Sequence, residues 1–382
     1  MELLFGDLLR IGAMDWVKMV IMWGIGGTLI YLAIKRDMEP ALLLPIGFGA
    51  ILVNLPFSGA VTQIVEKGVE EIGVLDVLFN GGIANELFPL LLFIGIGAMI
   101  DFGPLLSNPK MMLFGAAAQF GIFFTLSAAA FLGFDLKDAA SIAIIGAADG
   151  PTSIFVANYF DSKYIGAIIV AAYSYMAMVP IVQPPVIRLL TTRKERLIRM
   201  PYEQKSISRT TRILFPIVVT AIAGIFSPRS VALVGFLMFG NLLRECGVLR
   251  SLSESAQKEL ANLITIMLGI TVAAKMQAEF FLTFETLMIL GLGLIAFVMD
   301  TAGGVLFGKF LNLFSKNKVN PMIGAAGLSA FPMSSRVVHK MGLQEDPQNF
   351  LLMHAAGANV AGQIASVIAG GLIIKLVAGM IG

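Results

Sequence analysis

Long apolar runs separated by short polar stretches follow one another along almost the whole chain. They cover residues 16–34, 41–57, 86–100, 111–133, 164–190, 213–227, 229–243, 263–276, 285–313 and 350–381. Because roughly 17 to 25 apolar residues cross a bilayer as a helix, this pattern predicts an all-α polytopic membrane protein with about ten helical segments, some of them interrupted. The mixed, acidic stretch 60–84 is expected to be a loop or an interfacial helix.

One apolar stretch is interrupted at a charged residue. Residues 145–153 carry Asp149, followed at once by Gly150-Pro151, which cannot continue a helix without cost. The proline also frees a backbone carbonyl one turn earlier. A carboxylate, freed carbonyls and the hydroxyls of Thr152 and Ser153 are the groups that replace the hydration shell of a small hard cation. Sodium is the natural candidate for this site.

The alternative for Asp149 is a carboxylate at the lipid interface, or a protonated carboxyl bonded to a neighbouring helix. Apolar residues precede it from position 139 and continue through position 156. Because an ionisable group at this depth costs a few kcal/mol or more, a functional role is favoured.

A second interruption covers residues 320–332. Pro321 and Pro332 bracket a predicted helical piece of about ten residues, roughly 15 Å or half a bilayer. If the helix resumes after Pro332, Ser329 and Arg336 lie two turns apart on one face, about 10 Å from each other. Arg336 would then bind a carboxylate from the water side, with Ser329 deeper and Asn320 supplying another oxygen.

Each of these residues also has a purely structural interpretation. Arg336 suits an interface where its side chain reaches water, and Asn320 before proline is a common turn former. Ser329 and Gly324 ease close helix packing. Elsewhere, Tyr175 needs a partner for its hydroxyl, ordinarily a backbone carbonyl.

Asp300 is a second carboxylate inside an apolar run, beside Gly303-Gly304. Its depth makes it a candidate for a second ion or proton group.

The two interruptions share a local sequence. Ile145-Gly146-Ala147-Ala148 recurs as Ile323-Gly324-Ala325-Ala326, and Gly95-Ile96 recurs as Gly269-Ile270, at offsets of 178 and 174 residues. Paired interrupted segments in two halves indicate two inverted repeats whose broken helices meet near the membrane midplane. We therefore divide the chain into an N-terminal membrane segment (1–40), a first repeat with the Asp149 break and a proline-kinked helix (41–191), a basic connector (192–212), a second repeat with the 320–336 break (213–344) and a C-terminal membrane helix (345–382).

Composition agrees with this architecture. Of 382 residues, 57% are hydrophobic and 14% are charged, so no soluble domain can be separated from the membrane part. The net charge is +2 and the basic residues lie between apolar runs, which argues against a nucleic-acid partner. Basic residues outnumber acidic ones between 193 and 212, so the positive-inside rule makes this connector cytoplasmic. No soluble-enzyme motif is present.

At these residues the chain resembles the membrane β subunits of the sodium-pumping, biotin-dependent decarboxylases of oxaloacetate, methylmalonyl-CoA and glutaconyl-CoA. The most specific signs are Asp149-Gly150-Pro151-Thr152 in one half and the segment from Asn320-Pro321 to Arg336 in the other. The resemblance implies that the family's essential aspartate is Asp149 and its functional tyrosine Tyr175. The remaining functional positions that it implies are Asn320, Gly324, Ser329 and Arg336.

The resemblance also implies a reaction. Such a subunit decarboxylates carboxybiotin on a separate carrier while Na+ leaves the cell and a proton is consumed. Asp149, Asn320, Gly324 and Ser329 are then expected to hold Na+, with Thr152 and Asp300 as further candidates. Arg336 is expected to bind carboxybiotin, and the expected catalytic residues are Asp149, Tyr175, Ser329 and Arg336.

The implied partners are a biotin carrier subunit, a carboxyltransferase subunit, a small membrane subunit and membrane lipid. The implied location is the prokaryotic cytoplasmic membrane, and the implied assembly is a homo-oligomer, specifically a trimer. The competing interpretation is a sodium-coupled secondary transporter of an anionic solute, with Arg336 binding the solute carboxylate. Apart from the family resemblance, the sequence features give little basis for choosing between the decarboxylase subunit and the transporter.

Overall fold

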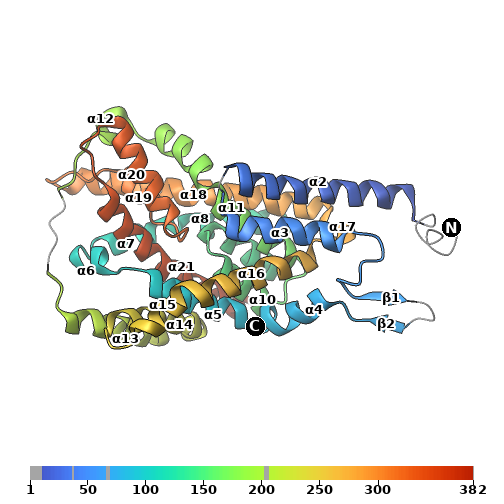
Figure 1. Ribbon diagram of the computed structural model, residues 1–382. Coiled ribbons are helices and arrows are strands. Elements are labelled where there is room, and N and C mark those ends of the chain that lie inside the picture. The colour runs from blue at the N-terminus through green and yellow to red at the C-terminus, as the bar shows by residue number, and fades with distance from the viewer. Residues whose placement is uncertain (1–10, 37, 66–68, 202–205, 382) are drawn as a thin grey trace.

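The computed structural model describes residues 11–36, 38–65, 69–201 and 206–381, and it consists of helices with one short β-hairpin (Figure 1). The first half contains α2 (Ala13–Arg36), α3 (Pro40–Val53), β1 (Gln63–Val65), β2 (Val69–Glu71), α4 (Val74–Leu78), the π-helical η3 (Phe79–Ile83), α5 (Leu87–Met99), α6 (Gly103–Ser107), α7 (Met111–Ala118), α8 (Phe120–Phe131), α9 (Leu136–Ala143), the 3-10 turn η4 (Ile144–Ala147), α10 (Gly150–Tyr159) and α11 (Ile165–Leu190).

The second half follows the short connector helix α12 (Arg193–Arg196). It contains α13 (Arg209–Phe226), η5 (Pro228–Ser230), α14 (Val231–Glu245), α15 (Arg250–Ser255), the π-helical η6 (Ala256–Leu260), α16 (Ala261–Val272), η7 (Ala273–Lys275), α17 (Ala278–Phe281), α18 (Phe284–Phe314), α19 (Met322–Ala325), α20 (Met333–Glu345) and α21 (Leu352–Ile381).

Within the described ranges, six helical stretches are long and apolar enough to cross a membrane. A seventh is possible if the pair Val74–Ile83 and Leu87–Met99, bent by 60°, forms one span. The six are Ala13–Arg36, Met111–Phe131, Ile165–Leu190, Arg209–Phe226, Phe284–Phe314 and Leu352–Ile381. The all-α polytopic membrane architecture predicted from the sequence is confirmed.

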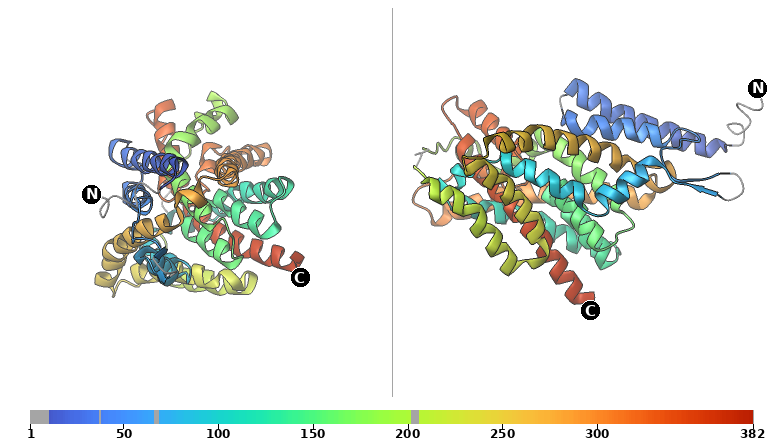
Figure 2. Two further views of the ribbon diagram at one scale, coloured as in Figure 1. Left: turned by 90° about the vertical axis from the view of Figure 1, so that its right-hand side faces the viewer. Right: turned by 60° about the horizontal axis from the view of Figure 1, so that its bottom comes forward.

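The expectation for residues 60–84 was partly wrong. The chain forms a hairpin there, with Gln63 opposite Glu71, before it enters α4. The base of the hairpin is fixed by Asp76, which accepts the Thr62 N–H at 2.6 Å, and by the Thr62 hydroxyl, which accepts the Gly73 N–H at 3.2 Å. These side chain to backbone bonds favour a turn over a continuous helix. The hairpin lies at the end of the molecule opposite the connector (Figures 1 and 2).

The two halves pack against each other reciprocally. Helix α3 of the first half packs on α16 of the second, and α14 of the second packs on α5 of the first. In the same way α11 packs on α18, and α21 packs on α7. The α5–α14 contact is close because Gly97 and Gly240 lie at it, where a Cβ on either would overlap the carbonyl of Leu237 or Ile94. Backbone-to-backbone contact of this kind is typical of membrane helices.

The first long helix described in each half runs in a different direction. In Figure 1, α2 runs from the hairpin end toward the connector end, whereas α13 starts at the connector end and runs back. These directions are those expected of inverted repeats.

The basic connector forms a clasp, by which we mean residues Thr191–Met200 with their partners from the second half. Arg196 pairs with Glu345 at 2.6 Å, and Arg199 pairs with Asp346 at 2.6 Å. The hydrogen bond from Arg199 lowers the pKa of Asp346, so this carboxylate stays ionised at neutral pH. The connector arginines are therefore engaged within the chain and tie the end of α11 to the end of α20.

Candidate functional site

The first interruption places Asp149 at a helix N-terminus inside the protein. The 3-10 turn η4 ends at Ala147. The next residue, Ala148, has a φ of 50° that turns the chain out of helical geometry, and α10 then begins with Gly150. Pro151 fits the first turn of α10 because no intrahelical partner is lost there. Asp149 caps this helix, and its side chain is 4% exposed.

The Asp149 carboxylate is held by hydroxyl groups. Its Oδ2 accepts the Thr152 hydroxyl at 2.7 Å and the Ser366 hydroxyl of α21 at 3.0 Å, and its Oδ1 accepts the Thr152 N–H at 3.5 Å. No arginine, lysine or histidine in the described ranges forms an ion pair with it. Hydroxyl donors do not neutralise a buried charge. A monovalent cation bound beside Asp149 would therefore compensate the charge of this carboxylate.

The second interruption is less helical than the sequence predicts. Helix α19 has only four residues, so the expected ten-residue half-helix is wrong. The physical reason is that side-chain amides take the carbonyls that would otherwise continue the helix. These amides are Gln183 on Ala325 at 2.8 Å, Asn359 on Leu328 at 2.5 Å, and Gln363 on Ser329.

The two interruptions touch at Ser329. Its N–H donates to the carbonyl of Ala147 at 3.2 Å, the carbonyl that Pro151 leaves without a helical donor. Its hydroxyl donates to the carbonyl of Gly362 on α21 at 3.0 Å. The sequence-based expectation that both breaks meet at one place is therefore met by Ser329.

Three further side chains at this junction were missed by sequence reasoning. The Tyr173 ring lies over Gly150, where an added Cβ would come within 2.6 Å of the tyrosine hydroxyl. That hydroxyl, the side-chain oxygen of Asn359 and that of Gln183 are buried without a hydrogen-bond partner. Unpartnered buried oxygens are costly unless something binds them, and cations bind carbonyl and hydroxyl oxygens.

Asn320 lies away from the junction of Asp149 and Ser329. Its amide donates to the carbonyls of Arg196 and Ile198 at 2.9 Å each, and its Oδ1 accepts the Met322 N–H at 3.1 Å. The structure therefore brings Asn320 to the connector clasp, with both ends of its carboxamide engaged by backbone.

Gly324 and Tyr175 make packing contacts in this structure. A Cβ at Gly324 would overlap the carbonyl oxygen of Gly304, and the reverse holds for Gly304, so α18 and α19 approach at two glycines. The Tyr175 hydroxyl donates to the carbonyl of Leu290 on α18. Its ring packs against Gly293.

Arg336 is exposed in the first turn of α20, while Ser329 is buried in the irregular segment between α19 and α20. The two do not share a helix face, because the helix begins only at Met333; this part of the expectation was wrong. Among the residues described, no acidic side chain forms an ion pair with the exposed Arg336, although Glu39, just before α3, lies close enough to interact with its charge.

Asp300 is fully buried on α18. Its carboxylate occupies space that a Cβ at Gly121 or Gly146 would fill, and the backbone amides at the start of α8 face it. No described cationic side chain pairs with it. A helix N-terminus favours a nearby anion, but by less than a full opposite charge.

These observations define a class. Interrupted helices from two halves of a polytopic membrane protein enclose a buried carboxylate and neutral oxygens, which is the arrangement of ion-coupled membrane transport proteins.

Comparison with known proteins identifies the family. Residues 18–377 match the family described as Na+-transporting oxaloacetate decarboxylase beta subunit. The chain is 48% identical over 374 residues to methylmalonyl-CoA decarboxylase subunit beta of Propionigenium modestum, covering 94% of each chain. It is 48% identical over 367 residues to glutaconyl-CoA decarboxylase subunit beta of Acidaminococcus fermentans, covering 96% of this chain and 95% of that one. It is 45% identical over 413 residues to oxaloacetate decarboxylase beta chain 2 of Salmonella typhi, covering 94% of this chain and 95% of that one. The protein belongs to the family of β subunits of sodium-pumping decarboxylases, which are multi-pass proteins of the prokaryotic cytoplasmic membrane that work in multi-subunit complexes.

Proposed function

We propose that this chain decarboxylates carboxybiotin presented by a partner carrier and couples that reaction to outward movement of Na+. The observation that carries the proposal is the Asp149 carboxylate, buried where the two interrupted segments meet and paired with hydroxyls instead of a cationic side chain. Family membership supports this function over the alternative, a secondary transporter of an anionic solute.

The proposed sodium ligands come from three elements. Asp149 supplies the charge, Thr152 the neighbouring hydroxyl, and Ser366 of α21 a second hydroxyl on the same carboxylate oxygen. Ser329 joins the set through its contact with Ala147. Asp300 is proposed as a second ion or proton group, because it is buried without a described cationic partner.

Asn320 and Gly324 act differently in our proposal. We assign them to positioning: Asn320 anchors the second interruption to the connector, and Gly324 lets it approach α18. Tyr175 is placed by its bond to Leu290 so as to fix α11 against α18.

The chemical step is the loss of CO2 from carboxybiotin. The bond between the ureido nitrogen and the carboxyl carbon breaks, CO2 leaves, and a proton is added to that nitrogen. Arg336, exposed beside the second interruption, is proposed to hold the carboxylate. A proton that reaches Asp149 would cancel its charge and weaken its hold on Na+, which links proton consumption to ion release.

The division of the chain made from the sequence is retained as a proposal. Opposite helix directions and reciprocal contacts between halves support two inverted repeats, joined by the connector 192–212. Alternating access would arise as one helix bundle moves against the other around Asp149. A biotin carrier, a carboxyltransferase, a small membrane subunit and trimeric assembly are proposed as the surrounding complex.

The test uses the purified chain in liposomes with labelled sodium and free carboxybiotin. Sodium movement that requires carboxybiotin, together with CO2 release that requires sodium, would support the pump. Exchange of sodium with an anionic solute in the absence of carboxybiotin would support the transporter instead.

A further inference from the structure

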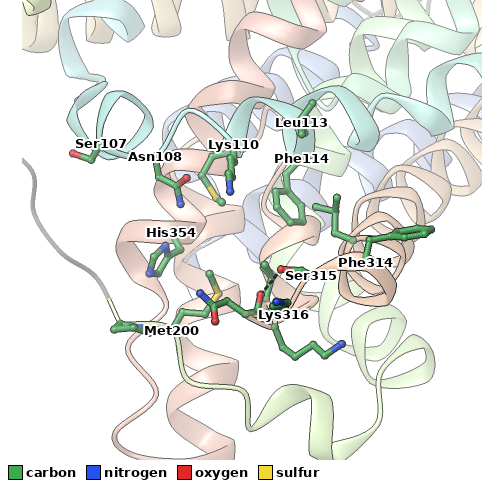
Figure 3. Close-up of a pocket in the computed structure, with 16 residues that line it drawn as sticks. Ser107, Asn108, Lys110, Leu113, Phe114, Met200, Phe314, Ser315, Lys316 and His354 are labelled. Carbon is green, nitrogen blue, oxygen red and sulfur yellow. Dashed lines mark hydrogen bonds between the residues drawn. The ribbon is translucent and has the colours of Figure 1, made fainter.

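A cavity of about 910 Å³ opens at the connector end of the molecule. It lies between the start of α7, the segment that follows α18 and the start of α21, as Figure 3 shows. Its walls are apolar in large part, with Leu113, Phe114, Met200 and Phe314 among the lining residues. Such a cavity suits a small ligand that has an apolar part.

The cavity has a positive rim, formed by Lys110, Lys316 and Lys318. None of the residues described as lining it is acidic. The Lys318 side chain donates to the carbonyl of Asn312 at 2.5 Å, whereas the side chains of Lys110 and Lys316 form no hydrogen bond or ion pair in the described part of the chain. This differs from the connector, whose arginines Arg196 and Arg199 are paired with acids. Two lysines that have no acidic partner among the described residues, Lys110 and Lys316, therefore lie together at the rim of the cavity.

We propose that this lysine-rimmed cavity captures the carboxylated bicyclic group of the carrier before the group reaches the decarboxylation site. The inference rests on the proposed function. The apolar walls suit the thioether ring of this group, and the lysines attract its carboxylate. Such charge complementarity raises the rate of capture more than it alters the chemical step. The cavity is thus a binding site separate from Arg336.

The cavity is connected to the second interruption. Val319 and Met200 both line it, and the sulfur of Met200 accepts the N–H of Asn320 at 3.3 Å. Ten residues after Val319, the N–H of Ser329 contacts the carbonyl of Ala147, close in sequence to Asp149. A ligand in the cavity therefore touches the segment that ends at the ion site, which gives capture a route to influence sodium binding.

The first test is kinetic. Lys110→Gln combined with Lys316→Gln should raise the KM for free carboxybiotin about tenfold, the loss of a charge-assisted contact, while kcat and the half-saturating sodium concentration stay unchanged. Both lysines are exposed, so the variant should fold. Arginine at both positions should restore the KM. Lys194→Gln, which removes an exposed charge from the connector but not from the cavity, is the matched control.

The second test measures binding without turnover. In a Cys246→Ser background, Asn317→Cys places one thiol in the cavity lining. Free carboxybiotin should slow the reaction of this thiol with a maleimide severalfold. Biotin, which lacks the carboxyl group on the ureido nitrogen, should slow it less. The same thiol at Lys194 should be unaffected.

Three outcomes would overturn the inference. One is an unchanged KM in the double lysine variant, another is an equal shift in Lys194→Gln. The third is protection of the thiol by phosphatidylglycerol but not by carboxybiotin, which would make the occupant an anionic lipid. Failure of the proposed function is distinct, because the unmodified protein would then show no sodium-dependent CO2 release at all.

Discussion

At the scale of single residues, the account depends on how a carboxylate is kept at depth. Asp149 accepts two hydroxyls on one oxygen and an amide on the other, and no described cationic side chain lies in ion-pair contact. Hydrogen bonds orient the carboxylate but leave its charge uncompensated. A bound sodium ion would supply the compensation, and its binding would then be sensitive to each hydroxyl.

Ser366 offers a specific test of this sensitivity. Ser366→Ala removes the hydroxyl that reaches Asp149 from α21, and we expect the half-saturating sodium concentration for decarboxylation to rise about fivefold, equivalent to about 1 kcal/mol. Ser127→Ala, on the exposed face of α8, is the control and should not change it. An unaltered sodium dependence in Ser366→Ala would remove Ser366 from the ion site.

Sequence reasoning found some of these residues and missed others for a physical reason. Asp149 and Ser329 stand beside helix breakers in the sequence, so the local pattern marks them. Ser366 and Asn359 lie in an uninterrupted apolar helix, and only the packing of α21 brings them to the breaks. Tyr173 and Tyr175 are two residues apart on one helix, hence on different faces, and nothing in their spacing says which face meets Gly150.

At the scale of elements, the second interruption illustrates what a pattern of prolines cannot reveal. Pro321 and Pro332 bound a segment that sequence spacing makes a half-helix. In the structure the segment unwinds after Ala325, because amides from α11 and α21 bind its carbonyls. These partners lie 142 and 31 residues away in the chain, outside the segment itself, and they decide its conformation. The span α11, by contrast, was predictable from its apolar length alone.

The close approach of α18 and α19 gives an element-scale prediction. Gly304→Ala would place a Cβ against the carbonyl of Gly324, and we expect a loss of stability of about 1–3 kcal/mol from overpacking. Gly291→Ala lies on the same helix with open space around it and should have little effect. Thermal unfolding in detergent measures both. Equal melting temperatures for the two variants would contradict the close contact.

The clasp gives a second element-scale prediction. Asn320→Ala removes two hydrogen bonds to the connector, so the connector should be cut faster by trypsin while the half-saturating sodium concentration changes by less than about twofold. Asn85→Ala, an exposed asparagine, is the control. A large change in sodium dependence with unaltered proteolysis would return Asn320 to the ion site.

At the scale of the whole molecule, different structures lie at the two ends of the proposed transport path. The connector and the lysine-rimmed cavity share one end, and the hairpin lies at the other (Figure 1). The positive-inside rule puts the connector end in the cytoplasm. Reciprocal packing of α3 on α16 and of α14 on α5 joins the two halves.

This orientation can be checked by labelling in intact cells. In the Cys246→Ser background, Glu70→Cys in the hairpin should react with a membrane-impermeant maleimide added outside. Lys194→Cys in the connector should react only after the membrane is permeabilised. Both side chains are exposed, so access to the thiol depends on the side of the membrane. The opposite labelling pattern would invert the proposed direction of sodium transport.

The measurement that tests the central claim most directly is carboxybiotin-driven sodium uptake into liposomes containing Asp149→Asn. Asparagine keeps the shape and the helix cap of aspartate but removes its charge. We expect both sodium transport and CO2 release to be lost, with the melting temperature retained and with full activity in the control Asp161→Asn, whose carboxylate is exposed. Sodium-stimulated decarboxylation that persists in Asp149→Asn would contradict the account.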